Sequence, residues 1–115
     1  MPGPALNPQV RALPVIPRER AHQDIEEVIG HYLEEGADEA ALGFIDALER
    51  AFTQIGRHPE SGSTRFAHEL DLPGLRSWPL KRFPYLVFYV VRKAHVDVWR
   101  ILHIRRDVPN WLQDE

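Results

Sequence analysis

Apolar side chains recur at helical spacing between residues 18 and 35. They fall three or four positions apart, as on one face of an α-helix. The apolar positions are Ile25, Val28, Ile29, Tyr32 and Leu33. Gly36 follows them, and glycine favours the left-handed conformation that commonly ends a helix. The pattern therefore predicts an amphipathic helix that stops at Gly36.

A second apolar stripe begins two residues later. Asp38 is an expected N-cap, and His58 ends the stretch because the residue before a proline avoids helical angles. The stripe consists of Ala41, Phe44, Ile45, Leu48, Phe52 and Ile55. The short link between the stretches predicts an antiparallel helical hairpin. We expect Phe44, Leu48 and Phe52 to be buried between the second helix and a sheet.

The remaining apolar runs have the character of strands. Residues 10 to 16 predict a short first strand, and Pro14 places it at a sheet edge. Residues 75 to 80, 85 to 91 and 96 to 104 predict three more, joined by four-residue links that suit antiparallel neighbours. Residues 59 to 74 are expected to be mostly loop. The predicted fold is α/β of the α+β kind: β-α-α-β-β-β, with a helical hairpin packed on a mainly antiparallel sheet.

The same pattern divides the chain. Residues 1 to 9, rich in proline, are expected to form a flexible N-terminal tail. Residues 10 to 109 form the predicted domain, and residues 110 to 115 a C-terminal tail. At 115 residues the chain fits one domain.

Alternation in the last strand predicts which side chains share a face. Val96, Val98 and Leu102 should point one way, and Trp99, Ile101 and His103 the other. Residues 85 to 91 are apolar on both faces, yet one hairpin covers only one. Either a protein partner covers the other face, which we favour, or residues 59 to 74 and 108 to 112 do.

Charge is segregated along the chain. Residues 19 to 60 hold 11 acidic and 3 basic residues, whereas residues 75 to 106 hold 8 basic residues and one acid, Asp97. A basic platform on a protein of net charge −3 favours an anionic partner, the alternative being that the cations only keep a sheet soluble. The chain has no cysteine, no apolar run near the ~20 residues of a membrane helix and no signal-like start, so we expect a cytoplasmic protein without membrane contact.

Few residues offer chemistry. The histidines have no metal-ligand spacing and there is no phosphate-binding glycine loop, so neither metal nor cofactor is expected. Arg100 falls on the apolar side of the last strand, where it either reaches past the sheet edge or pairs with a helical carboxylate. His103 is the one candidate for proton transfer. Its alternative role is structural, where the sheet meets the tail.

Several short segments carry a resemblance. They are Gly74-Leu75-Arg76, Phe83-Pro84-Tyr85-Leu86-Val87-Phe88-Tyr89, Ile101-Leu102-His103 and, most specific, His103-Ile104-Arg105-Arg106-Asp107-Val108-Pro109. Their order resembles the ParE branch of the RelE/ParE toxin superfamily over residues 10 to 109. The resemblance implies a toxin of a type II toxin–antitoxin module, neutralised by a ParD-like antitoxin and inhibiting DNA gyrase.

The RelE branch of the superfamily consists of ribonucleases that cleave messenger RNA on the ribosome. Such enzymes typically place an arginine where this chain has Tyr85, and a tyrosine or histidine where it has Arg105 and Arg106. Arginine does not exchange protons near neutral pH. The resemblance thus favours an inhibitor over an enzyme, with His103 as the possible catalytic residue if the RelE-type alternative holds. A third alternative is an inactive homologue that acts only in a regulatory complex.

The same reasoning gives a set of binding residues. We expect contacts with target or antitoxin from Arg76, Lys81, Arg82, Tyr85, Trp99, His103, Arg105 and Arg106. The antitoxin segment is expected to fold over the groove beside the hairpin and across the basic sheet, with Leu86 and Phe88 among its apolar contacts. No direct nucleic-acid binding is expected of the toxin alone.

Overall fold

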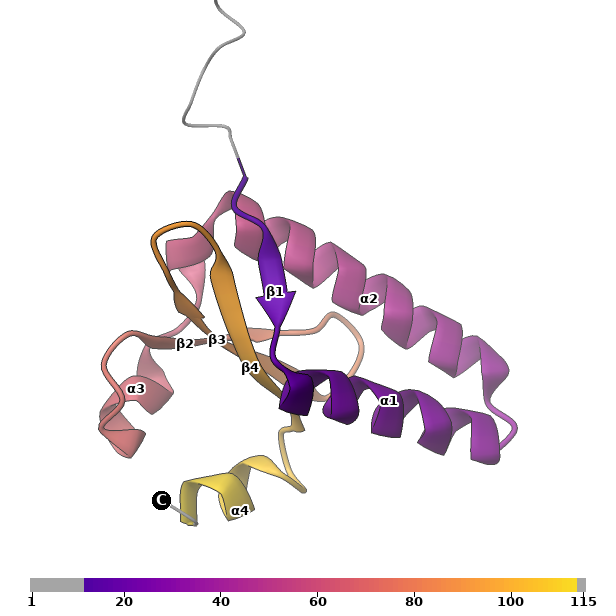
Figure 1. The fold of residues 1–115 in the computed structure, drawn as a ribbon. Helices are drawn as coiled ribbons and strands as arrows, with labels where there is room; N and C mark the ends of the chain where they lie inside the picture. The colour runs from indigo at the N-terminus through magenta and orange to yellow at the C-terminus, as the bar shows by residue number, and fades with distance from the viewer. Residues whose placement is uncertain (1–11, 114–115) are drawn as a thin grey trace, which may run out of the picture.

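The computed structural model describes residues 12–113, and the hairpin and sheet are both present (Figure 1). The helices are α1 (Glu19–Glu34), α2 (Asp38–Arg57), α3 (Arg65–Leu70) and α4 (Val108–Gln113), with a 3-10 turn η3 (Pro59–Ser61). The strands are β1 (Val15–Pro17), β2 (Leu75–Pro79), β3 (Tyr85–Val91) and β4 (Val96–His103). The α+β prediction is confirmed. Within residues 12–113, no helix has the length and apolar character needed to cross a membrane.

The four strands form one sheet in the order β1-β4-β3-β2. β2, β3 and β4 are antiparallel neighbours, as the short links predict. β1 pairs in parallel with β4 at the edge that Pro14 indicates, and the N–H of Val96 donates to the Pro14 carbonyl oxygen. β1 is shorter than predicted, beginning at Val15; the predicted strand residues 10 and 11 and the tail of residues 1 to 9 lie outside the described part.

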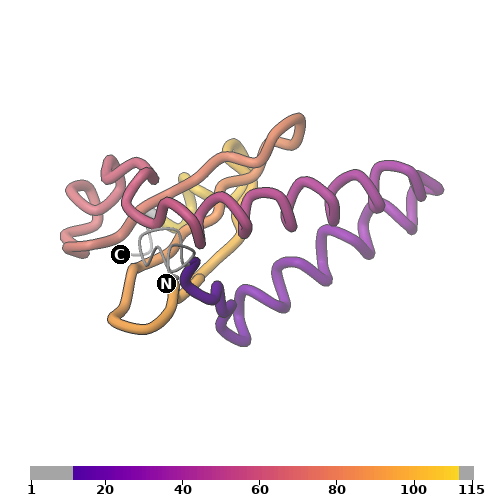
Figure 2. Tube along the Cα trace, turned by 90° about the horizontal axis from the view of Figure 1, so that it is seen from above, coloured from indigo at the N-terminus to yellow at the C-terminus, as the bar shows by residue number. Residues whose placement is uncertain are grey.

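The connection between α1 and α2 depends on Gly36, whose φ of +74° is the left-handed value expected of a helix-ending glycine. Capping of α2 by Asp38 is wrong. Ala37 is the N-cap and no side chain caps the helix. Asp38 lies one residue inside, where its charge still favours the positive end of the helix dipole. The hairpin tip extends beyond the strands, as the view from above shows (Figure 2).

The first core lies between the hairpin and the sheet. Phe44, Leu48 and Ile55 of α2 are buried there against Val87 and Tyr89 of β3. Phe52, predicted to be buried, is only partly so, because the alanines Ala47 and Ala51 bring α2 close to the sheet instead. Leu33, assigned to the apolar face of α1, is 51% exposed near the hairpin tip, where the sheet no longer covers it.

The second face of the sheet is covered by the chain itself. Phe66 and Leu70 of α3 and Val108 of α4 pack with Phe88 and Leu102. Residues 59 to 74 therefore form η3 and α3 rather than mainly loop, and α4 continues through most of the stretch assigned to the C-terminal tail. The favoured expectation of a partner on this face is wrong, and the alternative of internal cover is confirmed.

A β-bulge in β4 changes which residues share a face. Phe88 pairs with Arg100, but Tyr89 pairs with Val98, so Trp99 is an extra residue in β4. A bulge shifts the alternation of every later side chain. Ile101 therefore joins Val98 in the first core, and Leu102 joins the second. The predicted grouping of Val98 with Leu102 is wrong for this reason.

Candidate functional site

The turn between β2 and β3 and the turn after β4 meet at one end of the sheet. Tyr85, which begins β3, lies opposite His103, which ends β4. Beyond them the N–H of Ile104 donates to the Pro84 carbonyl oxygen over 2.9 Å. The two turns therefore lie at the same end of the sheet, and both carry basic residues. We call this set the cationic end; its members are Lys81, Arg82, Arg105 and Arg106.

Among the described residues, the cationic end forms no ion pair and contains more cations than acids. All four residues are exposed. In the part of the chain that the structure describes, the cations in ion pairs are Arg18, Arg20, His31, Arg50, Arg92 and Arg100, and none belongs to this set. An excess of like charges creates a local potential that attracts anions.

Tyr85 and His103 lie between the two turns with their rings edge to face, 5.2 Å apart. The Arg106 guanidinium donates to the Tyr85 hydroxyl oxygen over 3.2 Å. His103 Nδ1 accepts the backbone N–H groups of Arg105 and Arg106, each over 3.1 Å. The backbone N–H of His103 donates to a carboxylate oxygen of Asp107. His103 thus holds the turn after β4, in the position that the structural alternative describes, while a catalytic role for it stays a prediction.

The environment keeps both rings in their neutral, proton-bearing forms near pH 7. Burial lowers the pKa of His103, and the charges of Arg106 and Arg105 lower it further against the opposing effect of Asp107. Since Nδ1 accepts two hydrogen bonds, the proton of the neutral ring is on Nε2. Burial also raises the pKa of Tyr85, so its hydroxyl stays protonated. The acceptor atoms of Tyr85 and His103 are thus already used within the site, and Asp107 is the one anion there.

Two of the predicted binding residues lie away from the cationic end. Arg76 donates to the carbonyl oxygens of Glu60 and Gly62, both over 2.8 Å, and so fixes the segment after α2. Trp99 donates from Nε1 to Asp97 and stacks under the Arg18 guanidinium, 4.6 Å from the ring centre. The structure gives both side chains local partners. Contacts join Tyr85, His103, Arg105 and Arg106, whereas Lys81 and Arg82 lie in the neighbouring turn.

Arg100 pairs with a helical carboxylate, one of the two alternatives that the sequence allows. Its guanidinium donates twice to Asp24 of α1, over 2.8 and 3.0 Å. The same carboxylate accepts the N–H of Ile101, just beyond the part of β4 that β1 covers. The prediction from sequence does not identify this carboxylate as Asp24, one of the 11 acids between residues 19 and 60. Its position three residues after Ala21 and four before Val28 places it on the buried side of α1.

Asp97 joins the start of α1 to the sheet. It accepts hydrogen bonds from Arg18, Arg92 and Trp99. Burial opposes ionisation of Asp97, but these hydrogen bonds and the Arg18 charge outweigh it and lower the pKa to about 2. Among residues 12–113, no group of three or more His, Asp or Glu is placed to hold a metal ion.

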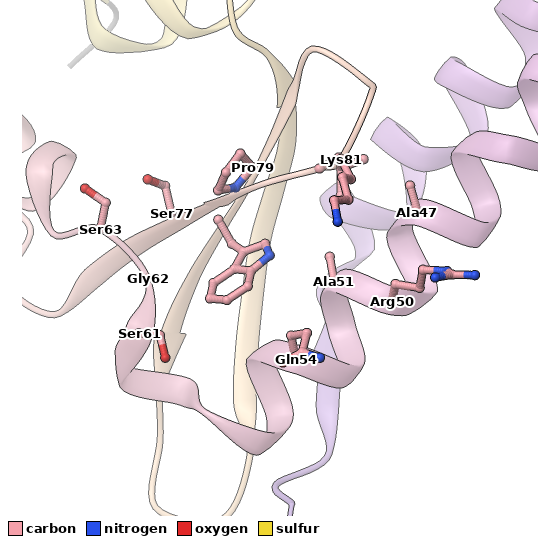
Figure 3. A pocket seen from close by; sticks show the side chains of 12 residues that line it. Ala47, Arg50, Ala51, Gln54, Ser61, Gly62, Ser63, Ser77, Pro79 and Lys81 are labelled. Carbon is pink, nitrogen blue, oxygen red and sulfur yellow. The ribbon is translucent and has the colours of Figure 1, made fainter.

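A groove of about 840 Å³ runs between α2 and β2 (Figure 3). Ala47, Ala51 and Trp78 supply apolar surface, while Arg50 and Lys81 supply charge. Arg50 is paired with Asp46 over 3.0 Å. Lys81 belongs both to this groove and to the cationic end, so the two features are continuous.

The arrangement of a helical hairpin on a mixed four-stranded sheet is also found in a solved structure, described as the chromosomal ParDE TA system from P. aeruginosa. The two chains match with a TM-score of 0.67 at 19% sequence identity, over 83% of this chain and 99% of the other. This similarity establishes a ParE-like fold.

A family model described as the ParE toxin of the type II toxin–antitoxin system, parDE, matches residues 15–108. The match spans most of the chain, and the chain therefore belongs to the ParE toxin family. No curated protein matches it in sequence.

Proposed function

We propose that this ParE-type toxin inhibits DNA gyrase in the cytoplasm and is neutralised there by a ParD-like antitoxin. The observation that supports inhibition over catalysis is the chemistry between the two turns. The exposed groups there are mainly cations, which can recognise an acidic or phosphate-bearing surface. They do not form an acid–base pair.

Cleavage of RNA through its 2′-hydroxyl needs a group that takes up the hydroxyl proton. His103 is poorly placed for this role, because Nδ1 already accepts two N–H groups and Nε2 carries the proton. Arg105 and Arg106 cannot act as bases. Among the described residues Asp107 is the carboxylate of this turn, and one of its oxygens accepts the backbone N–H of His103. These contacts weigh against the RelE-type ribonuclease alternative.

The groove between α2 and β2 supports the antitoxin part of the proposal. Its apolar floor and its Lys81 fit a segment that carries both apolar and acidic residues. A segment that is disordered when free can fold along such a surface and cover a large area. Phe88 was expected to contribute apolar contacts to the antitoxin, but it is fully buried. We therefore assign the apolar contacts to the groove.

A bulky substitution tests this assignment. Gln54 is exposed and lines the groove, whereas Thr53 is exposed beside it without lining it. We expect Gln54→Trp to weaken antitoxin binding by about tenfold or more, an effect of at least ~1.4 kcal/mol, and Thr53→Trp to leave it unchanged. Equal affinity for both variants would contradict the groove as the antitoxin site.

Salt separates the apolar and ionic parts of the same contact. Affinity for the antitoxin should fall as salt is raised, because screening weakens exposed charge pairs, but it should survive. Loss of all binding at moderate salt would contradict the apolar contribution of the groove.

A further inference from the structure

We infer that the cationic end binds the sugar–phosphate backbone of nucleic acid directly, without cleaving it. The inference differs from the sequence-based expectation that the toxin alone binds no nucleic acid. It does not require gyrase, and it concerns a surface other than the apolar floor of the groove between α2 and β2.

The first reason is the spatial pairing of two turns. Lys81 and Arg82 come from one turn and Arg105 and Arg106 from the other, and the contact between Ile104 and Pro84 holds the turns together. A row of separated cations can meet successive phosphates, each of which carries one charge. A single small anion would use only part of such a set.

The second reason is that, among residues 12–113, these cations form no ion pair while other cations do. Arg92 and Arg100 belong to the same basic half of the sequence, yet Asp97 and Asp24 neutralise them. The protein as a whole has a net charge of −3, so binding to a polyanion is not expected from its overall charge. It is expected only where cations are locally in excess. Asp107 is the acid within this turn, and it bonds to the His103 N–H.

The third reason is that the cationic end is held in place from behind. The Arg106 guanidinium donates a hydrogen bond to the Tyr85 hydroxyl oxygen. His103 Nδ1 accepts the backbone N–H groups of Arg105 and Arg106. Among the described residues, no buried side-chain nitrogen or oxygen lacks a partner, so the unpartnered Nε2 of His103 reaches solvent. It adds a neutral N–H donor that suits a phosphate oxygen.

Fluorescence anisotropy of the full chain with a labelled DNA duplex tests the inference. Four contacts predict that log K falls with log salt with a slope of roughly −3 to −4, so binding is measurable at low salt and weak at physiological salt. A single-stranded RNA of equal length is the second probe. Tighter binding of one probe identifies the source of the phosphates, and binding to neither at low salt would overturn the inference.

Two matched variants locate the contact. Lys81→Gln with Arg105→Gln removes one charge from each turn, and Arg57→Gln with Lys93→Gln removes two exposed charges elsewhere. We expect the first pair to weaken binding roughly tenfold for each charge at low salt and to reduce the slope by about 2. The control pair should change both the affinity at low salt and the salt slope by less. Equal losses for both pairs would show that only total charge matters and would overturn the site.

Integrity of the RNA probe is the last readout, scored on a denaturing gel after the binding experiment. Intact RNA is expected. Toxin-dependent cuts that disappear in His103→Ala, with the melting temperature unchanged, would overturn the claim that the site binds without cleaving.

Discussion

Two ends of the same sheet use arginine in opposite ways. Around β1 and the start of β4, Arg18 and Arg92 form ion pairs with Asp97. Further along β4, Arg100 forms an ion pair with Asp24. At the cationic end, Arg82 and Arg105 are exposed and in no described ion pair. The first group joins α1 to the sheet, and the second is available to a partner. The excess of basic residues in the sequence thus includes arginines that join α1 to the sheet and exposed arginines that we propose for recognition.

The largest expected effect is on the paired end. Asp24→Ala would leave Arg100 without its partner and the Ile101 N–H without an acceptor. Removing one member of a buried pair costs about 3–5 kcal/mol, a large part of the stability of a small domain. Chemical unfolding of this variant should therefore show a severe loss. A loss below about 1 kcal/mol would mean that the pair does not hold α1 to β4.

Asp97 should give a smaller effect that depends on pH. Its pKa falls from 3.8 to about 2 on folding, which corresponds to a contribution of roughly 2 kcal/mol. Because the folded pKa is the lower one, the contribution is present above about pH 4 and is lost as pH falls toward 2. Asp97→Asn should lower stability at pH 7 and flatten the stability curve between pH 4 and 2. A curve as steep as that of the wild type would contradict this role.

Substitutions at the cationic end should change toxicity rather than stability. Arg82→Gln and Arg105→Gln remove exposed charges, so each should change the free energy of unfolding by no more than about 0.5 kcal/mol. Their effect should be on toxicity, measured as growth after expression of the toxin without antitoxin. Substantial unfolding of either variant would show that the division between the two ends is wrong.

His103 should have the smallest effect on toxicity. His103→Gln loses the ring that accepts the N–H groups of Arg105 and Arg106 but keeps a side-chain donor. We expect a modest loss of stability, about 1 kcal/mol, and most of the toxicity to remain. A folded variant without toxicity would point to catalysis by His103.

The hairpin and the three antiparallel strands could be predicted because periodicity and short links determine them locally. The bulge at Trp99 could not, because it changes pairing without changing the alternation of residue types. The helix α3 was hidden in a stretch that turn residues make look like loop. The partners of each arginine depend on contacts between distant residues, such as Asp24 with Arg100, and local pattern does not show them.

The candidate site could be predicted only in part, because local pattern shows which residues are basic but not which partners they have. The basic residues of both turns stand out in the sequence, and the antiparallel order of β3 and β4 implies that Tyr85 and His103 meet. Arg76 belongs to the same basic part of the sequence, yet its guanidinium donates hydrogen bonds to the segment after α2. Ala47 and Ala51 give no signal of a groove, because small residues on a helix face also serve close packing.

The most direct test uses purified toxin with DNA gyrase and supercoiled plasmid, followed by detergent and protease treatment to reveal broken DNA. Inhibition of gyrase through the cationic end predicts toxin-dependent double-strand breaks, reduced in Lys81→Gln with Arg105→Gln and retained in Arg57→Gln with Lys93→Gln. The account is contradicted if gyrase is unaffected while the same toxin cleaves a translated messenger.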